Sequence, residues 1–295
     1  MWQQLQFVFD DLKKMEQTIP SPLVSVHWLN KNIANTNLVL LDCTIPKITS
    51  NLTTTSTEKK SRIKGAIFFD IKNTFSDKKA PFPTTILAAE EFEKQVQNLG
   101  IQQDSLIICY DDFGIYSAPR VWWMFQLMGF TNIAVLDGGF PEWIKHNFVT
   151  ENKKNDLPKK GNFKANYTPK KIKFTNDVLV ATKKETTLIV DARSKGRFYG
   201  TEPEPRNDIK SGHIPNSINL PFEEILEDEK MKTTIELKKM YHDFKTKEEL
   251  IFTCGSGITA SILAFAAELV GIKNYAVYDG SWTEWGSTNN LPIEK

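Results

Sequence analysis

The sequence has little of several features that mark common protein classes. No apolar run in its 295 residues approaches the roughly 20 needed to span a bilayer, so we expect no membrane as a partner. Its 37 Lys and Arg residues nearly cancel its 36 Asp and Glu residues, and this net charge of +1 does not favour nucleic acid. The three cysteines, Cys43, Cys109 and Cys254, are an odd number without metal-site spacing. We therefore expect no metal or cofactor, and a reducing, cytoplasmic location.

The N-terminal segment, residues 1–18, has an amphipathic pattern. Trp2, Leu5, Phe9 and Leu12 recur at helical spacing, which predicts a helical extension with one apolar face. A mitochondrial targeting helix is rich in arginine and poor in acids, whereas this segment carries several acidic side chains. We expect it to pack on the domain body or on a partner subunit.

The sequence contains an internal repeat. A glycine after a helical stretch, an Asp-Gly pair and a tryptophan each recur 142 residues later, which predicts two copies of one domain. These pairs are Gly129 and Gly271, Asp137 and Asp279, and Trp143 and Trp285. Within each copy short β-branched runs alternate with helical patterns, which is typical of α/β domains with a mainly parallel central sheet flanked by helices. We place the domains at 19–150 and 174–295.

Residues 151–173 separate the two copies. This stretch is rich in lysine, asparagine and proline and contains few apolar residues. Such a composition predicts an exposed linker rather than a binding surface.

Cys254 lies where an apolar run, Leu250–Thr253, meets an alanine-rich helical pattern that begins at Ala260. Unpaired backbone N–H groups at a helix start favour an anion, and such settings lower the pKa of a cysteine from roughly 8.5 to about 3.5–7.5. The intervening glycines allow the loop amides to turn inward. We therefore predict that Cys254 is a nucleophile. The offset of 142 places Asp112 at the equivalent position of the first copy, while Cys109 and Cys43 are predicted to be structural.

Two other readings of the same loop are weaker. Gly255-Ser256-Gly257-Ile258-Thr259-Ala260 fits the G-x-G-x-x-A pattern of dinucleotide-binding domains. The preceding cysteine has no role in that pattern, and few residues follow for the rest of such a domain. A cysteine phosphatase would place arginine at position 260, where this chain has alanine, so phosphoryl charge would go uncompensated.

The motifs around these landmarks resemble those of the tandem rhodanese-like sulfurtransferases, which act on thiosulfate or mercaptopyruvate. The resemblance covers nearly all of residues 22–295 and implies two rhodanese-like domains with the catalytic cysteine only in the second. Its motifs are Ser117-Ala118-Pro119-Arg120-Val121-Trp122-Trp123-Met124, Asp191-Ala192-Arg193, Gly196-Arg197-Phe198, Gly200-Thr201-Glu202-Pro203-Glu204-Pro205-Arg206, Gly212-His213-Ile214-Pro215 and Asp279-Gly280-Ser281-Trp282-Thr283-Glu284-Trp285.

The resemblance also implies a substrate and an acceptor. Uncharged Gly255 and Ser256 after the cysteine are similar to the mercaptopyruvate branch, whereas the thiosulfate branch carries cations there. Sulfur from 3-mercaptopyruvate would pass through a Cys254 persulfide to thioredoxin, glutathione, another thiol or cyanide, releasing pyruvate. A thiosulfate sulfurtransferase, or a carrier that delivers its persulfide to a protein partner, is the alternative.

The resemblance assigns roles to further residues. Arg197 and Arg206 would bind the substrate carboxylate and keto group, with Gly255, Gly257, Ile258 and Thr259 forming the substrate-binding loop. Alternatively, both arginines pair with Glu202, Glu204 or Asp208. Ser256 would assist catalysis. Alternatively, Ser256 and Thr259 cap the following helix.

One departure from the family concerns a histidine. Relatives carry a His-Ile-Pro-Gly-Ala stretch in the first copy, which a proposed proton relay uses, and here this stretch reads Arg62-Ile63-Lys64-Gly65-Ala66. His213 lies in the matching motif of the second copy, and we predict that it is structural. A relay through histidine is therefore not expected.

Overall fold

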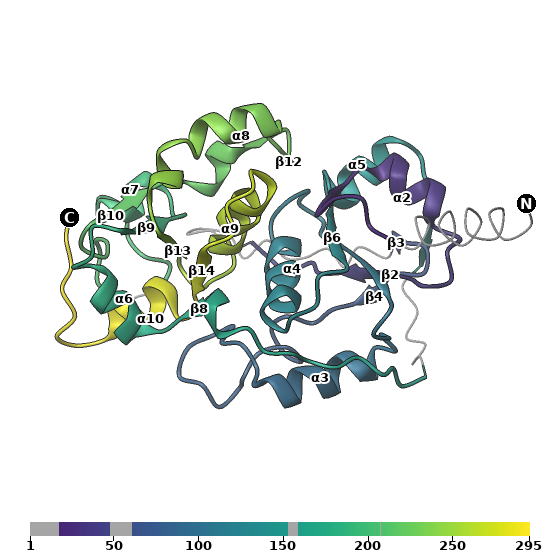
Figure 1. The fold of residues 1–295 in the computed structure, drawn as a ribbon, viewed down its shortest axis with the longest axis horizontal. Coiled ribbons are helices and arrows are strands. Elements are labelled where there is room, and N and C mark those ends of the chain that lie inside the picture. The colour runs from purple at the N-terminus through teal and green to yellow at the C-terminus, as the bar shows by residue number, and fades with distance from the viewer. Residues whose placement is uncertain (1–17, 48–60, 153–158, 207) are drawn as a thin grey trace, which may run out of the picture.

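The computed structural model describes residues 18–47, 61–152, 159–206 and 208–295. In this part of the chain two α/β bodies lie side by side, the first coloured purple to teal and the second green to yellow (Figure 1). The predicted N-terminal helix falls on residues 1–17, apart from its last residue, and so lies outside the described residues.

The first domain is built on a five-stranded sheet in the order β1-β6-β5-β2-β4, with every pairing parallel. Its strands are β1 (Leu23–Val24), β2 (Leu38–Asp42), β4 (Ile67–Phe68), β5 (Leu106–Tyr110) and β6 (Ile133–Leu136). The central strand β5 is buried along its whole length because helices cover both faces of the sheet, which explains its unbroken apolar run.

The second domain repeats this sheet strand for strand, in the order β10-β9-β13-β14-β8 and again all parallel. Its strands are β8 (Ile172–Lys173), β9 (Thr187–Asp191), β10 (Ser217–Asn219), β13 (Glu249–Thr253) and β14 (Tyr275–Tyr278). Read from β8, the order matches the first sheet read from β1. The predicted α/β fold with two parallel-sheet domains is confirmed.

Helices cover the sheets and short elements join them. The α-helices are α2 (Val26–Asn32), α3 (Ala89–Asn98), α4 (Ala118–Leu127), α5 (Gly139–Lys145), α6 (Thr175–Ala181), α7 (Lys195–Phe198), α8 (Thr234–Met240), α9 (Ala260–Leu269) and α10 (Ser281–Ser287). The short elements are β3 (Ser61–Ile63), β7 (Thr150–Asn152), β11 (Leu226–Glu227), β12 (Lys230–Met231), η1 (Pro169–Lys171), η2 (Phe222–Ile225) and η3 (Asp243–Thr246).

The segment predicted to be an exposed linker, residues 151–173, is only partly that. Its first residues belong to β7, which pairs with β3, and its last two form β8 in the second sheet. Between them Phe163 is fully buried in the core of the first domain. One aromatic ring thus anchors a stretch in which Lys159, Lys160, Lys164 and Lys170 are exposed, and composition alone gave too polar a picture. The second sheet begins at Ile172, two residues before the predicted boundary.

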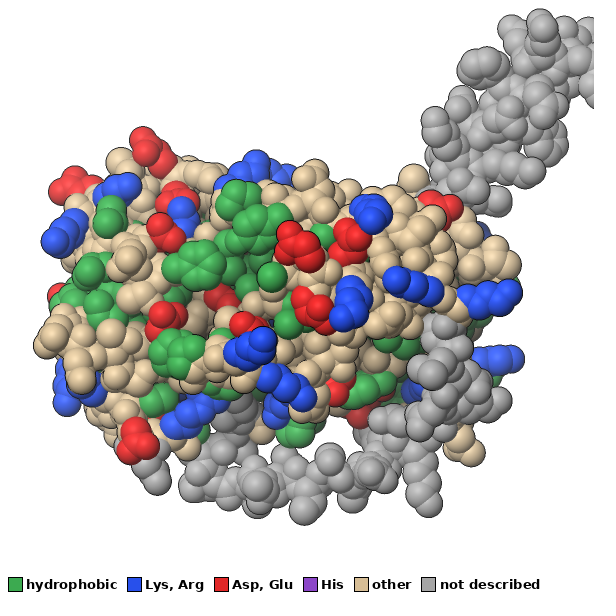
Figure 2. Space-filling model, turned by 90° about the horizontal axis from the view of Figure 1, so that it is seen from below, with side chains coloured by type: hydrophobic (Ala, Val, Ile, Leu, Met, Phe, Trp, Pro, Cys, Tyr) green, Lys and Arg blue, Asp and Glu red, His purple; other side chains and the backbone are tan. Residues whose placement is uncertain are grey.

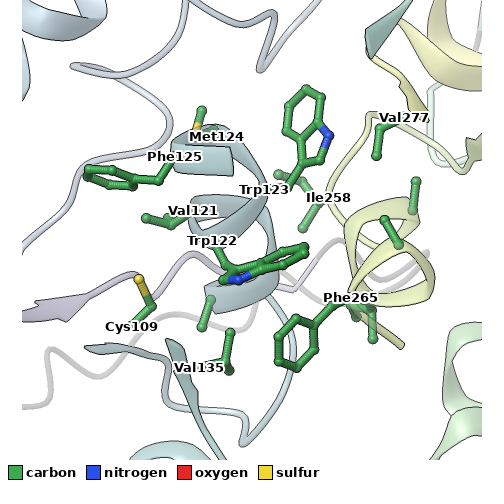
Figure 3. Packing of buried hydrophobic residues seen from close by; sticks show 14 of the residues in the cluster. Cys109, Val121, Trp122, Trp123, Met124, Phe125, Val135, Ile258, Phe265 and Val277 are labelled. Carbon is green, nitrogen blue, oxygen red and sulfur yellow. The ribbon is translucent and has the colours of Figure 1, made fainter. Parts of the chain in front are cut away.

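The two domains meet along α4 and α9, which face each other across the boundary (Figure 1). The rings of Trp122 and Phe265 contact edge to face with centroids 4.9 Å apart (Figure 3). Such an arrangement suits the opposed charges of ring edge and ring face. Beside them Arg120, fully buried, forms an ion pair with Asp279 of the second domain at 2.5 Å. The interface therefore buries Trp122, Phe265 and Arg120 as completely as a domain core would.

A hairpin of the second domain, β11 and β12, reaches over the first domain. The backbone N–H of Met231 donates to the Asp137 carboxylate at 3.1 Å, and Lys230 forms an ion pair with Glu142 at 2.7 Å. The backbone of Glu229 lies so close to Gly114 that a Cβ there would be 2.2 Å from its carbonyl oxygen. These contacts fix the hairpin as one wall of the space between the domains.

The surface carries no large region of one charge on the face in Figure 2, where Lys and Arg alternate with Asp and Glu. None of the helices in the described residues has the length and apolar character needed to cross a membrane.

Candidate active site

Cys254 directly follows β13 and comes six residues before α9 begins, as the sequence predicts. Its side chain is 1 % exposed and belongs to the wall of a cavity of about 1120 Å³ between the domains. The carboxyl ends of parallel strands β9 and β13 open toward this cavity, which is where α/β folds place their ligands.

The cavity contains most of the residues predicted for the site. It is lined by Cys254, Gly255, Ser256, Ile258, Thr259, Arg197 and Arg206. Gly257 is not among the lining residues. Its φ is +77° and a Cβ would lie 2.9 Å from Nη1 of Arg120, so this position needs glycine for backbone geometry and for the close approach of the first domain.

The loop of the first copy shows what such a loop binds. The residue that follows β5 is Asp111, because Tyr110 pairs with Asp42 as Thr253 pairs with Asp191. Our equivalence of Cys254 with Asp112 is thus wrong by one residue, since the loop before α4 is one residue longer than the loop before α9. The buried Asp111 carboxylate accepts hydrogen bonds at 2.8–2.9 Å from the amides of Phe113, Tyr116, Ser117 and Ala118.

The matching amides of the second copy have no such acceptor. They belong to Ser256, Ile258, Thr259 and Ala260, and within the described residues none of them donates to an oxygen atom. The same loop that holds a carboxylate in the first copy therefore presents its donors to the cavity in the second. This geometry suits an anion held at the position of Cys254.

Arg197 reaches the cavity from α7, whose first turn is capped by the hydroxyl of Ser194. Its guanidinium lies over the cysteine loop, since a Cβ on Gly255 would be 3.1 Å from Nη2. Glu204 holds Arg197 at 2.6 Å and holds the buried Arg193 at 2.8 Å. The ion pair that we considered as an alternative role for Arg197 is present, and it orients the guanidinium toward the loop.

Arg206 approaches the same space from the following turn. Nη1 donates to the hydroxyl of Thr283, and no carboxylate of the described residues lies within ion-pair distance of its guanidinium. Burial, and then repulsion from Arg197, lower the pKa of Arg206 from its usual value. Two guanidinium groups that repel each other across a cavity favour a bound anion, because the anion relieves the repulsion.

Other predicted residues fall as follows. The Thr259 hydroxyl does not cap α9, so this alternative role is not observed. His213 stacks on Phe198 at 3.9 Å and is not among the residues that line the cavity, in agreement with a structural role. Arg62, at the position of the family histidine, forms an ion pair with Glu151 at 3.1 Å that joins β3 to β7. Neither of these two residues reaches Cys254.

The contributions of the first domain and of η2 to the cavity were not predicted from the sequence. Lys47, Phe113 and Tyr116 of the first domain line it, as does Glu223 of η2. The Lys47 ammonium lies 4.8 Å from the ring centroid of Phe113. Tyr116 immediately precedes the Ser117–Met124 motif, and this neighbourhood is the one sequence signal that points to it. Nothing in the sequence around Lys47 or Glu223 indicates that they line the same cavity as Cys254.

Comparison with known proteins agrees with this geometry. The rhodanese-like domain model matches residues 25–146 and 175–288. The human 3-mercaptopyruvate sulfurtransferase is 37% identical over 274 residues, covering 89% of this chain and 91% of that protein. The rat thiosulfate sulfurtransferase is 35% identical over 281 residues, covering 92% and 94%. The crystal structure of SseA from Escherichia coli, a 3-mercaptopyruvate sulfotransferase, superposes with a TM-score of 0.78 at 30% identity, covering 89% of this chain and 99% of SseA.

A repeated parallel sheet, with one cysteine on the loop between strand and helix, defines a tandem rhodanese domain pair. The chain belongs to the rhodanese-like family, among its two-domain sulfurtransferases.

Proposed function

We propose that this enzyme takes sulfur from 3-mercaptopyruvate onto Cys254 and passes it to a thiol or cyanide, releasing pyruvate. The observation that carries the proposal is the position of Arg197 and Arg206 beside a cysteine loop that has no cation of its own. An α-keto acid presents a carboxylate and a carbonyl, which two guanidinium groups outside the loop can bind together. Relatives that act on thiosulfate share nearly the same identity, so the distinction rests on these residues.

The reaction follows from the groups in the cavity. The Cys254 thiolate attacks the sulfur of the substrate, the C–S bond breaks, and its electron pair goes to the substrate carbon. The products are a Cys254 persulfide and the enolate of pyruvate, which takes up a proton. An acceptor thiolate or cyanide then attacks the outer sulfur and regenerates the Cys254 thiolate, in a ping-pong sequence. Ser256 and the loop amides donate hydrogen bonds to the sulfur anion in both half-reactions.

Intact mass spectrometry tests the proposal. After addition of 3-mercaptopyruvate we expect a gain of one sulfur atom that maps to Cys254 and disappears on addition of cyanide. We also expect a much lower kcat/KM for thiosulfate than for 3-mercaptopyruvate. Equal values would contradict the assignment to the mercaptopyruvate donor. A persulfide that forms but reaches only a protein partner would support the carrier alternative.

The acceptor and the location remain part of the proposal. Thioredoxin, glutathione and cyanide all carry the nucleophile that the second half-reaction needs. The three cysteines are free thiols, and we propose a cytoplasmic location because a reducing compartment keeps Cys254 able to attack.

Glu223 is our candidate for the group that gives a proton to the enolate. Its carboxyl lines the same cavity as Cys254 and Arg197, in a protein whose family histidine is replaced by Arg62. Desolvation raises the pKa of Glu223, although Lys47 and Arg197 oppose the shift. A raised pKa keeps this carboxyl protonated to higher pH, so pyruvate formation should fall as pH rises through that pKa.

Glu223→Gln should therefore slow turnover of 3-mercaptopyruvate by about tenfold or more and remove that alkaline limb. Thiosulfate turnover should change less than about twofold, because its leaving group needs no proton on carbon. Glu224→Gln is the matched control, since the neighbouring Glu224 forms an exposed ion pair with Lys195 outside the cavity. If Glu223→Gln slowed turnover of 3-mercaptopyruvate and of thiosulfate equally, Glu223 would not be the acid that protonates the enolate.

A further inference from the structure

Hydrogen-bond donors from other segments hold the loop that carries Cys254 at four successive carbonyl groups, those of residues 254 to 257. Backbone N–H groups of Trp282 and Thr283 donate to the carbonyls of Cys254 and Gly255 at 2.8 and 2.9 Å. The next two carbonyls are contacted by the other domain. The Thr84 hydroxyl lies 2.8 Å from the Ser256 oxygen, and Nη1 of Arg120 lies 3.4 Å from the Gly257 oxygen, which also accepts from the Ser261 hydroxyl of α9 at 2.9 Å.

Holding a carbonyl fixes the amide that follows it. In a planar trans peptide the C=O and the next N–H point in opposite directions. Four held carbonyls therefore fix the directions of the N–H groups of residues 255 to 258. We propose that Thr84 and Arg120 are positioning residues. By holding the Ser256 and Gly257 carbonyls they fix the loop so that its free amides, that of Ile258 among them, face the Cys254 sulfur and stabilise its thiolate.

The conformation of Thr84 supports this role. Its φ is +62°, a left-handed value that is uncommon for a β-branched residue and that the surrounding structure must hold in place. Nη2 of Arg120 donates to the Thr84 carbonyl at 2.9 Å, and the amide of Ile86 donates to Asp279 at 2.9 Å. The Thr84 hydroxyl also lies 2.6 Å from the carbonyl oxygen of its neighbour Pro83, so the two carbonyl oxygens share one donor. Strain of this kind gathers at functional sites.

Arg120 is placed for the same purpose. It is fully buried, it forms an ion pair with Asp279 through Nη2, and its guanidinium stacks on Trp123 with 4.4 Å to the ring centroid. These contacts fix the orientation of the Arg120 guanidinium so that its Nη1 atom reaches the loop. The first domain, which has no catalytic cysteine, thus supplies a donor to two of the four carbonyls that shape the loop of the second.

The inference rests on the proposed role of Cys254 as a thiolate, and its test does not need turnover. We would measure the rate at which iodoacetamide alkylates Cys254, mapped by mass spectrometry, across a pH series. Thr84→Val keeps the shape and branching of the side chain and removes the hydroxyl. On the rising part of both rate curves we expect alkylation to slow by about three- to tenfold, which is a displacement of the curve by about half to one pH unit toward higher pH.

Two controls separate positioning from general damage. Thr84→Ser restores a hydroxyl and should restore the wild-type curve. Thr85→Val removes the neighbouring hydroxyl, which bonds to the Phe82 carbonyl at 2.9 Å, and should leave the curve unchanged. Arg120→Lys, checked for folding by thermal unfolding, should shift the curve in the same direction as Thr84→Val.

An unshifted curve in Thr84→Val would overturn the inference. A wild-type protein that gains no sulfur from either donor would instead contradict the proposed function, and the alkylation curves would still compare the variants. The two failures are therefore distinguishable.

Discussion

Cys254→Ser is expected to lower sulfur transfer by at least about a thousandfold with every donor and acceptor, because the persulfide can form only on this sulfur. A serine hydroxyl in the same place stays protonated near neutral pH and cannot carry sulfane sulfur between the half-reactions. The residue is small and its surroundings are already polar at the loop, so folding should change little. Steady-state rates with 3-mercaptopyruvate, together with intact mass after exposure to it, measure the effect.

Cys109→Ala is the matched comparison. Cys109 is fully buried within β5 of the first domain, and it does not line the cavity. Its loss should reduce the free energy of unfolding by about 1 kcal/mol and leave kcat nearly unchanged. Sulfur that still appears on the protein in the Cys254 variant, at a comparable rate, would mean that another thiol is the carrier.

Arg206→Met is expected to raise KM for 3-mercaptopyruvate by roughly 10- to 100-fold, as one charge-assisted bidentate contact is lost. This arginine is the cleaner of the two to remove, because no carboxylate of the described chain depends on it for an ion pair. Arg197→Met should also raise KM, but it additionally leaves one oxygen of the nearly buried Glu204 without its partner. Measurement of kcat and KM for each variant, with 3-mercaptopyruvate and with thiosulfate as sulfur donors, tests this expectation.

Arg206→Lys is the matched control for Arg206→Met, because it separates the charge from the shape of the guanidinium. Lysine keeps the charge but not the planar fork, so it should recover only part of the lost affinity. Unchanged KM in Arg206→Met, with a fall in kcat alone, would show that the guanidinium acts on the transition state rather than on the bound substrate. If neither KM nor kcat changes in Arg206→Met, Arg206 does not bind the substrate.

Much of this architecture was predictable because it depends on local patterns. Alternating β-branched and helical segments indicated the parallel sheets, and the constant offset of 142 between Gly129 and Gly271 indicated the repeat. The position of Cys254 at a strand end followed from the switch from an apolar run to a glycine-rich loop. The error of one residue at Asp111 arose because the offset changes inside the loop, where sequence offers no landmark. Phe163, a single apolar residue in a polar stretch, was too weak a signal to predict burial.

The amino-acid sequence alone predicted the fold class, which the structure confirms. It also singled out the proposed nucleophile and the two proposed substrate-binding arginines, because each of these features lies in residues close together along the chain. Only the tertiary structure decided what surrounds them. Thr84 and Arg120 touch the loop from positions 172 and 137 residues away in the sequence, and Lys47 enters the cavity from the other domain. Such contacts depend on how α4 packs against α9, and packing between distant segments leaves no periodic trace in a single sequence.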